Sequence, residues 1–189
     1  MTLNLTKLGL KQVINASGKM TILGVSKVSE GVLTAQRFGG EHFFEMSELA
    51  VKTGAYLAKL LQVEDAQIVS SASAGIAQSV AAVIGQGSSF HLYHPYSEKI
   101  QRREIILPKG HNVDYGTPVE VMVQQGGGQV VEAGYANMCS VDHIAQMISP
   151  QTAAILYIKS HHTVQKSMLS VKETAQVAKQ SGIPLIVDA

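Results

Sequence analysis

The stretch Ala153–Ala189, AAILYIKSHHTVQKSMLSVKETAQVAKQSGIPLIVDA, places a helical pattern between two short apolar runs. Ala153–Ile158 and Pro184–Val187 have the length and composition of buried strands. Ser170–Gln180 predicts a helix, because a serine and a glutamate three residues apart form a capping-box pattern at its start and a glycine follows its end. The stretch therefore predicts two parallel strands joined by a helix.

The same alternation of strands and helices runs through the preceding residues. Up to Gly40 the chain looks irregular, apart from a short strand that ends in a turn at Val13–Gly18. Helices are expected at Phe43–Gln62, Ile76–Ile84, around Val119–Val123 and at Val141–Met147, and strands at Gln67–Ser70, Glu104–Leu107 and Gln129–Glu132. This order predicts an α/β fold with a mostly parallel sheet and helices on both faces. Because the chain stops directly after a strand, we expect a domain that is incomplete at its C-terminus; an edge strand is the alternative.

The composition excludes several functional classes. Hydrophobic residues make up 46% of the 189 residues and charged residues 15%, as in a compact globular protein. A formal net charge of +1 leaves no basic surface for nucleic acid. The sequence shows no signal peptide and no apolar run long enough for a membrane span. A single cysteine, Cys139, cannot form an internal disulfide, so the cytoplasm is the expected location.

Ligands of parallel sheets bind beyond the carboxyl ends of the strands. After the first predicted strand, small residues at Ser71–Gly75 let a ligand approach the backbone, and the start of the next helix favours a phosphate; the four residues Ala72, Ser73, Ala74 and Gly75 are the candidate contacts. The alternative is a tight turn with a serine cap.

Three further strand ends carry groups suited to a flat, charged ligand. His111 could lie on a planar ring, although a loop histidine is commonly only solvated. Of His161 and His162 only one is expected to reach a given site, because neighbours in an extended chain point apart; no metal-ligand spacing accompanies them, so no metal is expected. Asp188 ends an apolar strand, and a carboxylate there needs a cationic partner, with metal ligation or helix capping as the alternatives.

Weaker candidates lie outside these strand ends. Asn15, Ser17 and Lys19 occupy the early turn and could bind substrate, and Arg37 could bind a carboxylate or phosphate. The aromatic, histidine-rich run His91–Tyr96 has no assigned role and is expected to be a mobile loop or an interface.

Taken together, these groups resemble the large domain of fold-type I pyridoxal-phosphate (PLP) enzymes. Leu107–His111 is similar to the loop that carries the stacking histidine in cysteine desulfurases, and Ile186–Ala189 is similar to the aspartate strand of this fold. The turn Ile14–Gly18 and the segment Ile158–Thr163 resemble the selenocysteine synthase-like family more closely. Gly18–Gly24 and Phe38–Phe43 look like its ammonia-lyase branch, which acts on D-glucosaminate 6-phosphate and related phosphorylated amino sugar acids.

The resemblance implies a cofactor, a set of roles and an organisation. PLP is the expected cofactor, with its phosphate at Ala72–Gly75, its ring on His111, its pyridine nitrogen at Asp188 and its phenolic oxygen near His162. The Schiff-base lysine is expected beyond Ala189. Residues 1–40 form an N-terminal segment and 41–189 the N-terminal part of the PLP-binding domain. The implied protein is a homo-oligomeric lyase that releases ammonia and a 2-keto-3-deoxy acid. The near-neutral charge and the short apolar runs argue against nucleic acid and membrane partners, and the short stretch before the turn at Asn15 argues against a tRNA substrate.

Two other functions remain open. The first is a selenocysteine synthase-like transferase or another PLP enzyme of the same fold. The second belongs to a different class, a non-catalytic fragment that binds PLP or assists assembly without the lysine.

Overall fold

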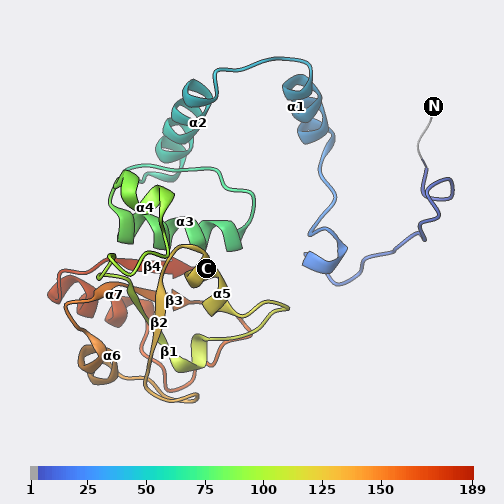
Figure 1. Cartoon of the computed structure of the whole chain (residues 1–189). Helices are drawn as coiled ribbons and strands as arrows, with labels where there is room; N and C mark the ends of the chain where they lie inside the picture. Colours follow the sequence, from blue (N-terminus) through green and yellow to red (C-terminus); the bar gives the residue numbers. More distant parts are fainter. Residues whose placement is uncertain (1–3) are drawn as a thin grey trace. The chain divides into compact units, whose positions relative to one another are not determined.

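A computed structural model of the chain describes residues 4–189 (Figure 1). Contacts between Cα atoms divide the chain into two compact units, one running to Gln67 and the other from Ile68 to Ala189. The expected boundary after residue 40 stays a prediction. The elements in chain order are η1 (Thr21–Leu23), α1 (Glu30–Gly40), α2 (Met46–Leu61), α3 (Ala72–Gly85), α4 (Ser89–Tyr93), β1 (Glu104–Pro108), η2 (Lys109–His111), α5 (Val119–Gln125), β2 (Gln129–Ala133), α6 (Val141–Met147), β3 (Thr152–Ile158), α7 (Val171–Gln180) and β4 (Leu185–Asp188).

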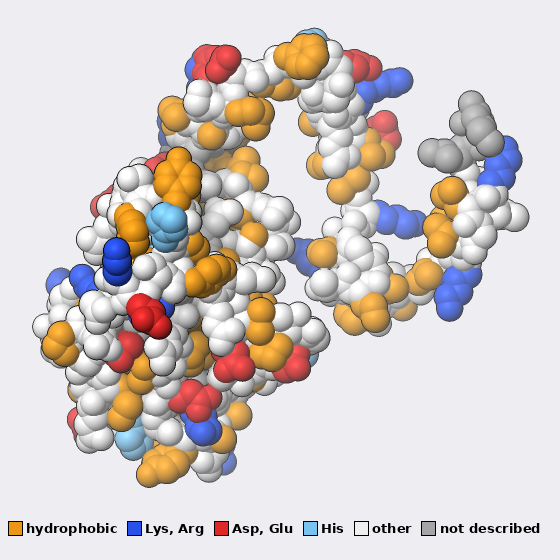
Figure 2. Space-filling model, viewed as in Figure 1, with side chains coloured by type: hydrophobic (Ala, Val, Ile, Leu, Met, Phe, Trp, Pro, Cys, Tyr) orange, Lys and Arg blue, Asp and Glu red, His pale blue; other side chains and the backbone are white. Residues whose placement is uncertain are grey.

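The first unit consists of helices and irregular chain. In α2, Gly54 and Ala58 are buried, and a Cβ atom on Gly54 would lie 2.5 Å from the carbonyl oxygen of Ala66. The chain that leaves α2 therefore folds back closely over this turn of the helix, and only glycine fits there. Most large apolar side chains of this unit are exposed within the described residues (Figure 2).

The second unit is built on a four-stranded sheet in the order β2-β1-β3-β4. All three strand pairs are parallel, as the sequence predicts. The central strand β3 is buried along its whole length, and its last residue, Ile158, pairs with Asp188 at the end of β4. Parallel pairing brings the carboxyl ends of β1, β3 and β4 to one edge of the sheet.

Helices cover both faces of this sheet, which confirms the predicted fold class. Alternate residues of a strand face opposite sides, so Ile105 and Leu107 pack in one apolar cluster and Ile106 in another. The first cluster also contains buried residues of α3 and α5, and the second contains residues of α6 and α7. None of the helices within residues 4–189 is both long and apolar enough to cross a membrane.

The structure corrects four local expectations. The stretches 67–70 and 13–18 form no strand, because a short apolar run does not specify a pairing partner. Conversely, α1 lies in the stretch expected to be irregular. The first part of the run 91–96 belongs to α4 and is not a loop, while the alternative of an interface stays a prediction. The Ser29 and Ser88 hydroxyls accept hydrogen bonds from the backbone N–H groups three residues later. These two N-cap serines were the sequence features that could have predicted the starts of α1 and α4.

Candidate functional site

Asp188 lies at the carboxyl edge of the sheet, where its backbone and its carboxylate have different roles. Its carbonyl oxygen accepts a hydrogen bond of 2.7 Å from the Lys159 N–H, which ties the end of β4 to the chain leaving β3. Its side chain is half-buried, and burial raises the pKa of the carboxyl. Within residues 4–189 no salt bridge joins it to a cation. A half-buried carboxylate without a cationic partner is suited to bind a positively charged ligand group.

The start of α3 provides an anion-binding terminus. The helix begins at Ala72, so the predicted turn is itself the first turn of the helix. The Ser71 hydroxyl accepts from the Ala74 N–H at 3.1 Å, and the Gly75 N–H donates to the Ser71 carbonyl at 2.9 Å. Ala72 and Ser73 are exposed. Their N–H groups and the helix dipole favour a phosphate.

The packing of α3 brings this terminus to the sheet. Ile76, one turn into the helix, is buried in the same apolar cluster as Ile158 at the end of β3. Ile186 of β4 packs against that cluster, and α3 contacts both strands. The anion-binding turn and the Asp188 carboxylate thus belong to one helix–sheet layer.

His111 occupies a different environment from the predicted one. It ends the 3-10 turn after β1, and its side chain has no exposed surface. Its Nδ1 accepts the Ile158 N–H at 3.4 Å, its ring meets Tyr157 edge-on with centroids 4.6 Å apart, and burial lowers its pKa. Nε2 has no hydrogen-bond partner within the described residues. A neutral imidazole here joins the turn after β1 to the end of β3. The predicted stacking of His111 on a planar ligand ring stays a prediction, and the burial of the side chain does not support it.

The two histidines after β3 are exposed, with ring centroids 4.0 Å apart. His162 also meets Tyr115 edge-on at 5.5 Å. Tyr115, which the sequence reasoning missed, lies in the loop after β1. The pKa of its phenol is raised by burial and by the negative charge of Asp188. The structure therefore brings Tyr115 near both His162 and Asp188.

The weaker candidates belong to the unit that runs to Gln67. The Asn15 side chain accepts from the Ser17 N–H at 2.9 Å and donates to the Gly18 carbonyl at 2.6 Å, so the predicted turn is present. Lys19 is exposed. Arg37 pairs with Glu41 at 3.4 Å on the surface of α1. Roles for Asn15, Ser17, Lys19 and Arg37 in substrate binding stay predictions.

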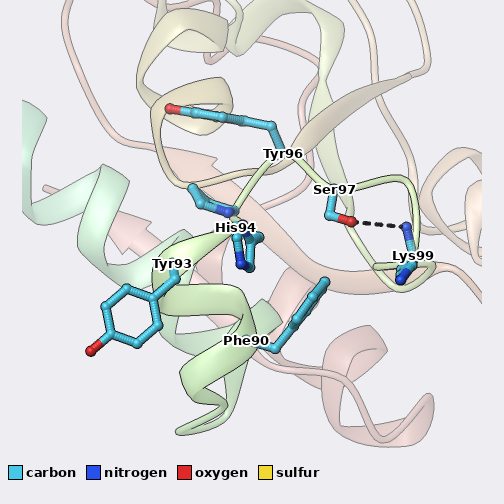
Figure 3. A pocket seen from close by; sticks show the side chains of 7 residues that line it. Phe90, Tyr93, His94, Tyr96, Ser97 and Lys99 are labelled. Atoms are coloured by element: carbon cyan, nitrogen blue, oxygen red, sulfur yellow. Dashed lines mark hydrogen bonds between the residues drawn. The ribbon is translucent and has the colours of Figure 1, made fainter.

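The aromatic run that carried no assignment forms α4 and the wall of an open hollow of about 670 Å³ (Figure 3). Phe90, Tyr93, His94 and Tyr96 line it, with Lys99 at one end. His91 points the other way and is buried. One Arg103 Nη atom donates to the carbonyl oxygens of Pro95 and Ser97, so a half-buried cation holds the segment in place.

Comparisons with known proteins cover nearly the whole chain. No protein-family model matches it. It is 45% identical over 183 residues to D-glucosaminate-6-phosphate ammonia lyase from Salmonella typhimurium, which covers 97% of this chain and 50% of that protein. It is 33% identical over 190 residues to 5'-C-glycyluridine monooxygenase-decarboxylase from a Streptomyces species, covering 100% of this chain and 48% of that protein. The chain thus spans about half the length of the curated relatives that it matches.

Solved structures agree with these relatives. A structure of D-glucosaminate-6-phosphate ammonia-lyase superimposes with a TM-score of 0.94 at 46% identity, over 100% of this chain and 52% of that one. An aspartate aminotransferase from Thermotoga maritima has a TM-score of 0.55 at 13% identity over 97% of this chain and 48% of that one, and shows the fold alone. The chain is thus similar in sequence and fold to the corresponding half of D-glucosaminate-6-phosphate ammonia lyase, and it shares the fold of an aspartate aminotransferase.

Proposed function

We propose that the protein is a PLP-dependent ammonia-lyase that acts on a phosphorylated amino sugar acid such as D-glucosaminate 6-phosphate and yields a 2-keto-3-deoxy acid. The observation that carries this proposal is the 45% identity to the Salmonella ammonia lyase along 97% of the chain. The residues at the carboxyl edge of the sheet agree with it, because they offer an anion-binding helix start and a carboxylate in need of a cation.

These residues fit the cofactor group by group. The first turn of α3, Ala72–Gly75, presents N–H groups and the Ser73 hydroxyl to a phosphate. Asp188 offers a half-buried carboxylate to a protonated pyridine nitrogen, and its own raised pKa falls back when such a cation binds. His162 is exposed at the same edge and would contact a polar oxygen on the ring. We retain these residues as the proposed cofactor site. His111 stays in the proposal as a buried residue next to them, at the end of β1.

The bound cofactor supplies an electron sink next to the substrate's α-carbon. This chain's part is to bind and orient: the helix start fixes the phosphate, and Asp188 holds a proton on the ring nitrogen. We propose that the Schiff-base lysine lies outside residues 1–189, so the general acid/base is also outside them. We further propose a homo-oligomer in the cytoplasm with no nucleic acid or membrane partner, on the family resemblance, the single cysteine and the near-neutral charge.

A second reaction on the same scaffold is favoured by one observation. The Streptomyces relative, named as a monooxygenase-decarboxylase, is 33% identical over the whole chain. A related scaffold thus carries a different reaction, so the likeness of this chain to its relatives does not by itself choose between the two. Ammonia release from D-glucosaminate 6-phosphate by the full-length protein supports the lyase, whereas PLP binding without ammonia release supports another reaction of the fold.

Asp188→Asn tests the cofactor site itself. Losing a charge-assisted contact costs about 1.5–3 kcal/mol, so we expect the affinity for PLP to fall roughly 10- to 150-fold. Asp142→Asn, an exposed carboxylate in the first turn of α6, is the matched control. Equilibrium titration of PLP into the full-length protein measures both. Equal affinities of the wild type and the Asp188 variant would remove Asp188 from the site.

The same substitution has the opposite effect on the ligand-free protein. Because the folded-state pKa of Asp188 is raised, the folded state binds its proton more tightly than the unfolded state does. Asp188 therefore lowers stability as the pH rises through the interval between its unfolded and folded pKa values. We expect Asp188→Asn to raise the free energy of unfolding at neutral pH and to leave it unchanged below the ordinary carboxyl pKa of about 3.9, as measured by urea denaturation at both pH values.

A further inference from the structure

Tyr115 stands at the tip of a short loop that is closed by hydrogen bonds. The Val113 carbonyl accepts the Val119 N–H at 3.1 Å, and the Asp114 carboxylate accepts the Gly116 N–H at 2.6 Å. Gly116 has a φ of +101°, a backbone conformation that residues other than glycine rarely adopt. The loop is therefore held in one shape before any ligand arrives, and it presents a tyrosine that is 39% exposed.

The ring of Tyr115 lies over the edge where β1, β3 and β4 end. The loop leaves β1, yet the ring meets His162 from the loop after β3, with centroids 5.5 Å apart. The charge of Asp188, at the end of β4, acts on the Tyr115 hydroxyl and contributes to its raised pKa. One aromatic face is thus brought together with groups from all three strand ends.

His111 and Tyr115 both follow β1, but only one of the two rings is accessible. The His111 ring is enclosed by the core, with Tyr157 against it and the Ile158 N–H on its Nδ1. Reaching a ligand would require it to leave a site with no exposed surface. Tyr115 needs no such movement.

We propose that Tyr115, rather than His111, supplies the aromatic face on which the PLP ring lies. His111 acts from the core by fixing the turn that begins this loop. The phenol stays protonated near Asp188, so the loop adds no second negative charge beside the carboxylate. This inference rests on the proposed function, because it assigns a residue to the proposed cofactor site.

Removal of the ring tests the inference by affinity and by spectroscopy. In the full-length protein, Tyr115→Ala is expected to weaken PLP binding by roughly 2- to 10-fold, the range for losing an aromatic pair, and to change the circular dichroism that bound PLP shows in its visible band. Tyr115→Phe keeps the ring and should retain both. Where the alanine variant fails to fold, Tyr115→Leu keeps the bulk and loses the aromatic face.

Tyr135→Ala is the matched control. Tyr135 also follows a strand and also meets a histidine edge-on, His143, with centroids 5.6 Å apart. It follows β2, three strands from β4, or about 14 Å at the usual strand spacing. Its loss should leave the affinity for PLP and the visible band unchanged.

The outcomes separate the inference from the proposed function. If the wild-type protein binds no PLP, the proposed function fails, and the inference fails with it. If the wild type binds PLP and Tyr115→Ala or Tyr115→Leu binds it equally well with the same dichroism, only the inference is overturned. A raised KM for the amino sugar acid with unchanged PLP affinity also overturns it, because Tyr115 would then contact substrate.

Discussion

Gly85 and His91 fit together so closely that a single substitution can test their contact. Gly85 is the last residue of α3, and an added Cβ would lie 2.6 Å from Nδ1 and 3.0 Å from Cγ of His91. The opposite side of the ring faces Gly127, where an added Cβ would lie 3.1 Å from Nε2. The two glycines therefore enclose the imidazole that anchors α4.

Gly85→Ala has two opposing effects on the free energy of unfolding. Alanine in place of a helical glycine is worth about 0.5–1 kcal/mol in a helix interior, and less at a last residue. Overpacking against His91 costs about 1–3 kcal/mol. In the wild-type background the clash outweighs the gain, so we expect a net loss. In a His91→Ala background the clash is gone, and the same substitution should be neutral or stabilising.

A double-mutant cycle by urea denaturation of the full-length protein measures this difference. We expect Gly85→Ala to be less damaging in the His91→Ala background by about 1–3 kcal/mol. His91→Ala alone also loses stability because its packing is removed, and the cycle subtracts that loss. An equal cost of Gly85→Ala in both backgrounds would refute the reasoning, since the imidazole would then not be what excludes the Cβ.

Two more predictions concern single side chains. Burial raises the pKa of the Cys139 thiol to about 11, so iodoacetamide at neutral pH should label it far more slowly in the native protein than in urea, as followed by mass spectrometry; equal rates would show that the thiol is accessible. Ser170→Ala removes the hydroxyl that accepts the Glu173 N–H at 3.2 Å, which should cost about 1 kcal/mol and lower the Tm by about 2–4 °C in calorimetry; an unchanged Tm would show that the capping box adds nothing measurable.

The sheet could be predicted because its strands are apolar runs of sufficient length between clear stops. Glu104–Pro108 and Thr152–Ile158 are found within one residue of the expected limits at each end, and α6 covers the expected residues 141–147. The run 67–70 has a similar composition, but it forms no strand. Composition alone does not show whether a sheet has a place for another strand.

The candidate site was only partly predictable for a related reason. Strand ends can be read from a sequence, so Asp188 and His162 were expected at the ends of two parallel strands, and β4 and β3 do pair in parallel there. Ser73 was expected to follow a strand at 67–70 that does not form, and it lies in the first turn of α3. Which side chain of a loop turns outward depends on how that loop folds. His111 is drawn into the core next to Tyr157, and Tyr115 takes the exposed position. An aspartate, an aromatic residue and a glycine in succession were the local sign of that turn.

Asp188 pairs with Ile158, so the register between β3 and β4 decides on which face of the sheet the Asp188 carboxylate lies. Side chains alternate along a strand, so sliding β4 by one residue would turn the acid toward the opposite layer of helices. Apolar contacts of Leu185 and Ile186, on opposite layers, resist that slide. Substitutions of these apolar residues are therefore expected to remove the Asp188 carboxylate from the site, although no polar residue at the edge has been changed.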